Sequence, residues 1–209
     1  MSSSTQAVHE ARQQVIAAGR FAAARGWVPA TSGNFSARVD AHHAVVTLSG
    51  RDKGQLTEAD LALVALAEPL PAGLSAEAPL HIARYRADPA IGAIFHVHAV
   101  NAAVISRRHE QQGEIKVAGW ELLKAFAGIH THTQSVRVPV FANSQDIPTL
   151  AGQVEQRLQD FPADALAPGY LLAGHGLYAW GRNGAEAQRH LEAFDALLQL
   201  QLEWERITA

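Results

Sequence analysis

Apolar residues recur at helical spacing over several segments of the chain. The segment from Val8 to Phe21 keeps one apolar face and is followed by Gly26, which predicts an N-terminal helix that ends near this glycine. The segment from Ala185 to Arg206 is the longest of this kind and predicts a C-terminal amphipathic helix. Shorter helices are expected over the ranges 75–87, 101–108, 120–126 and 149–161.

Continuous apolar runs bounded by turn residues predict buried strands between these helices. The runs cover 44–48, 61–67, 90–100, 137–140 and 170–173, and the stretch 26–38 becomes strand-like toward its end. Such a mixture of short strands and helices indicates an α/β or α+β protein in which helices cover a central sheet. With 209 residues, the chain 1–209 is expected to form one domain with a single large core.

Composition argues against several classes of protein. The chain is 48% hydrophobic and 18% charged, as ordinary globular proteins are. Its net charge of −3, without a basic stripe, argues against nucleic acid or an anionic membrane as a partner. The first residues are polar, and no apolar run approaches the ~18 residues of a membrane span, so we expect neither a signal peptide nor a transmembrane helix, and a cytoplasmic location.

Cysteine is absent and histidine is abundant, with 11 residues. The absence of cysteine excludes a disulfide framework, a zinc–thiolate site and a thiol nucleophile. A metal would therefore have to be held by histidine and carboxylate side chains.

Two histidines, His96 and His98, lie one residue apart inside the apolar run 90–100. Side chains at i and i+2 of a strand project from the same face, so both imidazoles would point into one place. Two convergent imidazoles suit a divalent metal, with zinc as the first choice. Taken alone, the pair could equally be two hydrogen-bonded histidines near the end of a strand.

A third histidine, His175, favours the metal interpretation. It lies between Gly174 and Gly176, directly after the apolar run 170–173. A strand that ends in a flexible turn could carry His175 to the same point as the first pair. Three protein ligands with an open position are the pattern of a catalytic metal site rather than a closed structural one.

Three turns rich in small residues could bind an anion. Glycines let backbone N–H groups approach an anion closely, and hydroxyl, amide and ammonium groups add further donors. Each turn could also be an ordinary loop, and only their combination with a metal site suggests a phosphate monoester as ligand. The candidate residues are Ser32, Gly33, Asn34, Ser49, Gly50, Lys53 and Ser75.

Two glutamates, Glu77 and Glu121, stand near the starts of predicted helices. Glu121 precedes an apolar helical face, and an acid among apolar neighbours is expected to have a raised pKa, which suits proton transfer. Both could instead be solvated or capping residues. Five further histidines are expected at the surface, and the second closely spaced pair, His130 and His132, has polar flanks and is a poor competitor for a metal. The five are His9, His42, His43, His109 and His190.

These motifs, taken together, resemble the class II aldolase/adducin family over nearly the whole stretch from Gly26 to Trp180. The three histidines His96, His98 and His175 look like its metal ligands. Its anion loops and acid motif look like Thr31–Ser36, Leu48–Gly50 and Ser75–Glu77. Further segments are most similar to the branch that eliminates water from a ketose 1-phosphate in methionine salvage: Leu48–Gly54, Glu77–His81, Gly119–Lys124, Asn143–Asp146 and Gly174–Gly181.

The resemblance implies a three-layer α/β/α domain with a mostly antiparallel central sheet. It also implies one Zn²⁺ per subunit, a sugar-phosphate substrate and a homotetramer with active sites near subunit contacts. In this branch the position matching Glu121 is the acid/base, whereas in the aldolases the position matching Glu77 has that role; this chain has both. We expect a hydro-lyase in which Glu121 is the principal acid/base and Glu77 is a further residue of the site. The alternatives are a sugar-phosphate aldolase, which breaks a carbon–carbon bond, and a non-catalytic adducin-like interaction domain.

Overall fold

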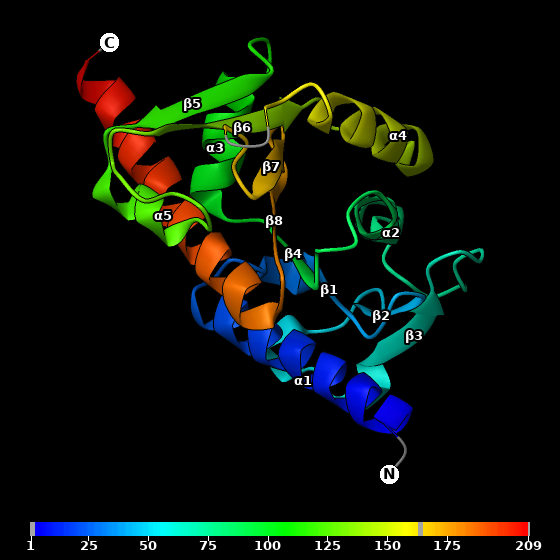
Figure 1. Cartoon of the computed structure of the whole chain (residues 1–209). Coiled ribbons are helices and arrows are strands. Elements are labelled where there is room, and N and C mark those ends of the chain that lie inside the picture. The colour runs from blue at the N-terminus through cyan, green and yellow to red at the C-terminus, as the bar shows by residue number, and fades with distance from the viewer. Residues whose placement is uncertain (1–2, 163–164, 209) are drawn as a thin grey trace.

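A twisted eight-stranded sheet forms the middle of the molecule and separates two groups of helices (Figure 1). The computed structural model describes residues 3–162 and 165–208. The strand order is β3-β2-β1-β4-β8-β7-β6-β5, and all neighbouring strands run antiparallel except β6 and β7. The strands are β1 (Asn34–Arg38), β2 (His43–Thr47), β3 (Leu61–Ala65), β4 (Ala93–Val97), β5 (Glu114–Ala118), β6 (Ser135–Phe141), β7 (Gly169–Leu172) and β8 (Gly176–Gly181).

Five α-helices cover the two faces of this sheet. Helices α1, α3 and α5 share one apolar core with the sheet, and α2 and α4 share the other. Figure 1 shows α1 and α5 following one side of the sheet, with α2 and α4 on the opposite side. The helices are α1 (Ser3–Ala24), α2 (Ala78–Ala87), α3 (Val100–Arg108), α4 (Ile147–Leu158) and α5 (Gly184–Ile207). Short 3₁₀ turns are η1 (Pro29–Thr31), η2 (Lys53–Gln55), η3 (Glu58–Asp60) and η4 (Glu121–Ala125).

The central strand β4 contributes to both cores, which explains why its sequence is apolar except at His96. Ala93 and Phe95 belong to the core under α1, α3 and α5, whereas Ile94 between them belongs to the core under α2 and α4. Successive side chains of a strand alternate between faces, so a strand covered on both sides is apolar at most of its positions. Full burial of a side chain such as Phe95 contributes about 1.5–3 kcal/mol to stability.

The predicted three-layer α/β/α arrangement with a mostly antiparallel sheet is confirmed. Two strands, β5 and β8, were not predicted, and the segment 120–126 forms a 3₁₀ turn rather than an α-helix. Helix α2 begins at Ala78, with Glu77 at its N-cap position, so Ser75 lies before the helix. No helix within residues 3–162 and 165–208 has the length and apolar character of a membrane span.

We expect Gly176→Ala to destabilise the fold by about 1–3 kcal/mol, because a Cβ there would lie 2.2 Å from the Val97 carbonyl oxygen. Gly152→Ala in α4 is the matched control. Its Cβ would meet no atom within 4 Å, and alanine should add about 0.5–1 kcal/mol through better helix propensity. Urea unfolding measures both changes. A G176A variant as stable as the wild type would contradict the close packing of β4 against β8.

Candidate metal centre and adjoining cavity

Four side chains from three parts of the chain converge at one end of the central strands. The candidate ligand atoms of Glu77, His96, His98 and His175 all lie within 4.8 Å of one another. Among the described residues, this is the one group of at least three metal-type ligands that lie so close together. The three histidines are those that the sequence predicted as metal ligands, and Glu77 is the fourth member.

The first two histidines are brought together by the end of β4. His96 lies within the strand and is fully buried, and His98 follows immediately after the last residue, Val97. Their Nε2 atoms are 3.0 Å apart. The spacing of i and i+2 therefore directs both rings to one side, as predicted.

The third histidine, His175, lies in the tight turn between β7 and β8. Gly174 has a φ of +65°, which favours glycine, and Gly176 lies too close to the Val97 carbonyl for any side chain. The turn carries the Nε2 atom of His175 to 3.0 Å from that of His98. Glycine is therefore required at both positions, at Gly174 for its backbone conformation and at Gly176 for the close approach of the Val97 carbonyl oxygen.

Glu77 approaches the histidines from the N-terminal end of α2. Its two carboxylate oxygens lie 3.0 Å from His175 Nε2 and 3.3 Å from His96 Nε2. Asn34, which pairs with His96 across β1 and β4, donates its side-chain amide to Glu77 Oε2 at 2.7 Å. Burial would raise the pKa of Glu77, but the hydrogen bonds with His175 and Asn34 and the neighbouring histidines hold it well below its usual range.

Second partners orient two of the imidazoles for metal binding. His96 Nδ1 lies 3.0 Å from the Leu177 carbonyl oxygen, to which it donates. His175 Nδ1 lies 3.2 Å from Asn143 Oδ1. When Nδ1 carries the proton, the lone pair of Nε2 faces the cluster, which is the arrangement of histidine ligands in metalloproteins.

Burial keeps the imidazoles of His96 and His98 in the neutral form that binds metals. It holds the pKa of His96 well below its ordinary value and lowers the pKa of His98 to about 4. Neutral rings with lone pairs facing one another are unfavourable unless a cation lies among them. The residues present therefore fit a divalent metal ion.

A cavity of about 170 Å³ opens beside His98 and Glu77. Its wall contains all seven residues that the sequence predicted for anion binding, so the fold brings the three separate turns together. The lining residues are Thr31, Ser32, Gly33, Asn34, Leu48, Ser49, Gly50, Lys53, Ser75, Glu77 and His98.

Lys53 is the buried cation of this cavity, only 2% exposed. Its ammonium group donates to the carbonyl oxygens of Thr31 at 2.6 Å and Arg51 at 2.7 Å, and burial lowers its pKa. Thr31 has a φ of +63°, an unusual conformation for a β-branched residue. Lys53 thus fixes a strained backbone turn. The third proton of its ammonium group is left to face an anion in the cavity.

Glu121 lies outside this cluster. Its side chain is 70% exposed, hydrogen-bonds with Lys124 and lies 3.5 Å from His132. The hydrogen bond with Lys124 lowers the pKa of Glu121, with a further contribution from its charge. The expectation that apolar neighbours raise this pKa is therefore wrong for the single chain, because the carboxylate points into solvent rather than toward the apolar face.

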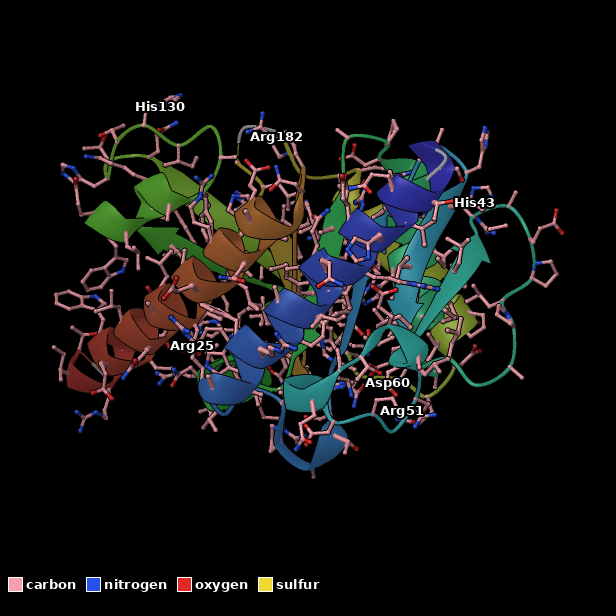
Figure 2. All side chains as sticks on the ribbon, turned by 90° about the horizontal axis from the view of Figure 1, so that it is seen from below. Arg25, His43, Arg51, Asp60, His130 and Arg182 are labelled. Carbon is pink, nitrogen blue, oxygen red and sulfur yellow. The ribbon has the colours of Figure 1, made fainter. Side chains whose placement is uncertain are left out.

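The histidines other than His96, His98 and His175 do not belong to the metal centre. His130 lies on an outlying loop, at the opposite end of the view from Arg51 and Asp60, which pair at 3.4 Å (Figure 2). The prediction for His190 is wrong: it is 1% exposed, because its two ring nitrogens bond the Trp180 carbonyl and the Ala127 amide in the core. No local pattern around His190 indicated that role, which depends on the packing of α5 against distant segments.

Sequence reasoning also did not single out Tyr178, whose ring stacks on His96 at 4.0 Å between centroids. It lies in β8, opposite His96 in the strand register. Only the pairing of two strands 80 residues apart reveals this contact, so no local pattern could have indicated it.

The sequence and the fold are similar to those of known proteins. Residues 13–202 match the Class II Aldolase and Adducin N-terminal domain. The chain belongs to the class II aldolase and adducin family. An L-fuculose-1-phosphate aldolase from Thermus thermophilus has the same fold, with a TM-score of 0.74 and 27% identity over 94% of each chain.

Within the family, the chain is similar to methylthioribulose-1-phosphate dehydratases. It is 53% identical over 193 residues to the one from Parvibaculum lavamentivorans, covering 92% of this chain and 93% of that protein. It is 56% identical over 185 residues to the one from a Bradyrhizobium species, covering 88% of this chain and 86% of that protein. These similarities extend over almost the entire chain and confirm the resemblance seen in the motifs.

Replacing His96 or His98 by alanine should remove most of the bound metal, because each change withdraws one neutral nitrogen ligand from a small buried cluster. Elemental analysis of the purified variants measures this directly. His130→Ala, on the outlying loop, is the control and should keep the metal content of the wild type. Full metal occupancy in both cluster variants would contradict the assignment of the ligands.

Proposed function

We propose that the protein is a zinc-dependent hydro-lyase that converts 5-methylthioribulose 1-phosphate to 2,3-diketo-5-methylthiopentyl 1-phosphate in methionine salvage. The observation that carries the proposal is the cluster of three histidines and one glutamate beside a cavity rich in anion-binding groups. The high identity to methylthioribulose-1-phosphate dehydratases supports the choice of reaction and substrate.

The choice of zinc rests on ligand type and spacing. With Zn–N bonds of about 2.0–2.1 Å, tetrahedral ligand atoms lie about 3.3 Å apart. The distances of 3.0 Å between Nε2 atoms in the cluster are close to that spacing. We therefore propose one Zn²⁺ per subunit, held by His96, His98 and His175.

The phosphate group of the substrate is proposed to occupy the cavity beside the metal centre. Backbone and side-chain donors of Ser32, Gly33, Asn34, Ser49, Gly50 and Ser75 would surround it, and Lys53 would add positive charge. Binding at this unreactive end would fix the carbonyl and hydroxyl carbons next to the histidines. This use of remote binding energy orients the reacting atoms and lowers the barrier of the chemical step.

The reaction removes the C3 proton and the C4 hydroxyl group. A bound divalent metal supplies Lewis-acid stabilisation of the negative charge that develops beside the C2 ketone. The C4 hydroxyl takes up a proton and departs as water, and the resulting enol tautomerises to the 2,3-diketone. A carboxylate that accepts the C3 proton becomes the carboxylic acid that can supply a proton to the departing hydroxyl, so one acid/base group serves both steps.

We assign the proton transfer to Glu121 and regard Glu77 as an ionised member of the metal centre. The low pKa of Glu77 makes it unsuited to donate a proton near neutral pH. Glu121 is exposed in the single chain and would act at the site of a neighbouring subunit. Burial of its carboxyl group against that subunit would raise its pKa into the range of an acid catalyst.

Exposed apolar side chains support such an assembly. Val100 and Val104 on α3, and Trp204 and Ile207 at the end of α5, are between 51% and 74% exposed. Leu122, next to Glu121, is 38% exposed. Apolar surface of this kind is typical of protein interfaces, and we propose a homotetramer. A cytoplasmic location follows from the substrate, because a charged phosphate ester does not cross membranes unaided.

Incubation with 5-methylthioribulose 1-phosphate should give a diketone, detected by its ultraviolet absorption. A chelator should abolish product formation, and added Zn²⁺ should restore it, because the developing charge then has its stabilising metal again. Heat-treated protein is the control. Dihydroxyacetone phosphate instead of diketone would show cleavage of the C3–C4 bond and would support the aldolase alternative, which the structural similarity to L-fuculose-1-phosphate aldolase favours.

Glu121→Gln should lower kcat by ~10²–10⁴-fold and leave the metal content unchanged, since an amide cannot supply the proton. Mixing the E121Q and H96A proteins under conditions of subunit exchange should restore part of the activity. The recovery is expected because a mixed tetramer pairs an intact Glu121 with an intact metal centre of the other subunit. No recovery in verified mixed tetramers would contradict action across the interface.

A further inference from the structure

A stripe of polar side chains runs through the core beneath the metal centre, between the sheet and α2. Asn34 and Ser36 come from β1, His81 and Tyr85 from α2, and Tyr178 from β8; none of them is more than 1% exposed. Burying such groups is costly unless each has a hydrogen-bond partner. Their common position therefore requires an explanation beyond core packing.

The half of the stripe farther from the metal centre is fully bonded. Ser36 Oγ lies 2.7 Å from His81 Nδ1 and 2.8 Å from the Tyr85 hydroxyl. Arg38 donates to the Tyr85 carbonyl oxygen at 2.7 Å and lies over the Tyr85 ring. These bonds fix the ring of His81 and leave its Nε2 atom for another partner.

The half nearer the metal centre contains three polar atoms that lack a hydrogen bond of standard geometry. Among the described residues, none makes such a bond with His81 Nε2, the Tyr178 hydroxyl or Asn34 Oδ1. The rings of His81 and Tyr178 meet edge to face at 5.7 Å. Burial and the nearby Tyr170 and Glu77 raise the pKa of Tyr178 well above its ordinary value, whereas Asn34 lowers it, so the Glu77 carboxylate and the Asn34 amide lie near this hydroxyl.

We propose that these three atoms bind one internal water molecule, and that His81 and Tyr178 are thereby positioning residues of the metal centre. A buried water typically makes about three hydrogen bonds to groups that would otherwise be unsatisfied. Water both donates and accepts, so it can serve an amide oxygen, a hydroxyl and a ring nitrogen together. The inference rests on the metal centre of the proposed function.

Two metal-centre residues depend on this water through their neighbours. A hydrogen bond at Asn34 Oδ1 fixes the amide plane, and the amide nitrogen then points at Glu77 Oε2 at 2.7 Å. A hydrogen bond at the Tyr178 hydroxyl fixes the ring that stacks on His96. The orientation of one carboxylate and one imidazole of the cluster is thus coupled to His81, which belongs neither to the cavity lining nor to the group of metal-type ligands.

Tyr178→Phe tests the proposal without a large change of volume. We expect its zinc affinity, measured by chelator competition, to fall about 10-fold, as is usual when a group behind a metal ligand is lost. kcat should fall with it, while KM for the sugar phosphate stays within about twofold because Tyr178 itself does not line the cavity. An idle buried hydroxyl would behave otherwise: its removal would leave zinc affinity unchanged and make the protein more stable toward urea.

A matched pair at His81 separates its two ring nitrogens. Asparagine can replace Nδ1, which bonds Ser36, whereas the longer glutamine can reach the place of Nε2. We therefore expect His81→Asn to lose about 10-fold in zinc affinity and His81→Gln to keep most of it. Tyr85→Phe, which affects only the far half of the stripe, should retain the affinity of the wild type.

The outcomes distinguish this inference from the proposed function. If the wild type binds zinc and both Y178F and H81N bind it equally well, the positioning role is overturned. If H81N does not fold, the zinc affinity of Y178F alone tests the positioning role. If the wild type binds no zinc, the proposed metal centre fails, and a crystal structure then tests the water alone: density within hydrogen-bond distance of all three atoms supports the site, and a direct contact among them overturns it.

Discussion

The close approach of β4 to β8 is the constraint on which the rest of the site depends. Gly176 lies against the Val97 carbonyl with no space for a Cβ atom, and this contact lets His175 reach the end of β4. The same pairing places Tyr178 opposite His96. Because cores are close-packed, a small outward shift of β8 would separate the third histidine from the first two.

Glu77 and Glu121 have different electrostatic surroundings. Glu77 accepts a hydrogen bond from Asn34 and lies 3.0 Å from His175 Nε2 inside the cluster. Glu121 hydrogen-bonds with Lys124 at the surface, and burial against a second subunit would raise its pKa. In the proposed function the two carboxylates have different roles because their surroundings differ, Glu77 as a negative charge of the metal centre and Glu121 as the acid/base.

The cavity beside the metal centre combines a strained backbone turn with a buried cation. The buried ammonium group of Lys53 bonds two backbone carbonyls and holds Thr31 in the left-handed region. The buried cation and the strained turn both lower the stability of the fold unless a negatively charged ligand is bound. An incoming phosphate would compensate part of that cost, which links the stability of this corner of the fold to substrate binding.

The sequence by itself determined the chemistry: the paired histidines on one strand, the histidine between glycines, the small-residue turns and the missing cysteine. These features are local, since strand periodicity and glycine conformation act over a few residues. It also predicted the long helices and most strands. Only the tertiary structure decided that Glu77 joins the cluster, that Glu121 is exposed, and that Tyr178 and His81 lie behind the metal centre. Those relations arise from strand register and from burial, which depend on packing between distant segments rather than on any local pattern.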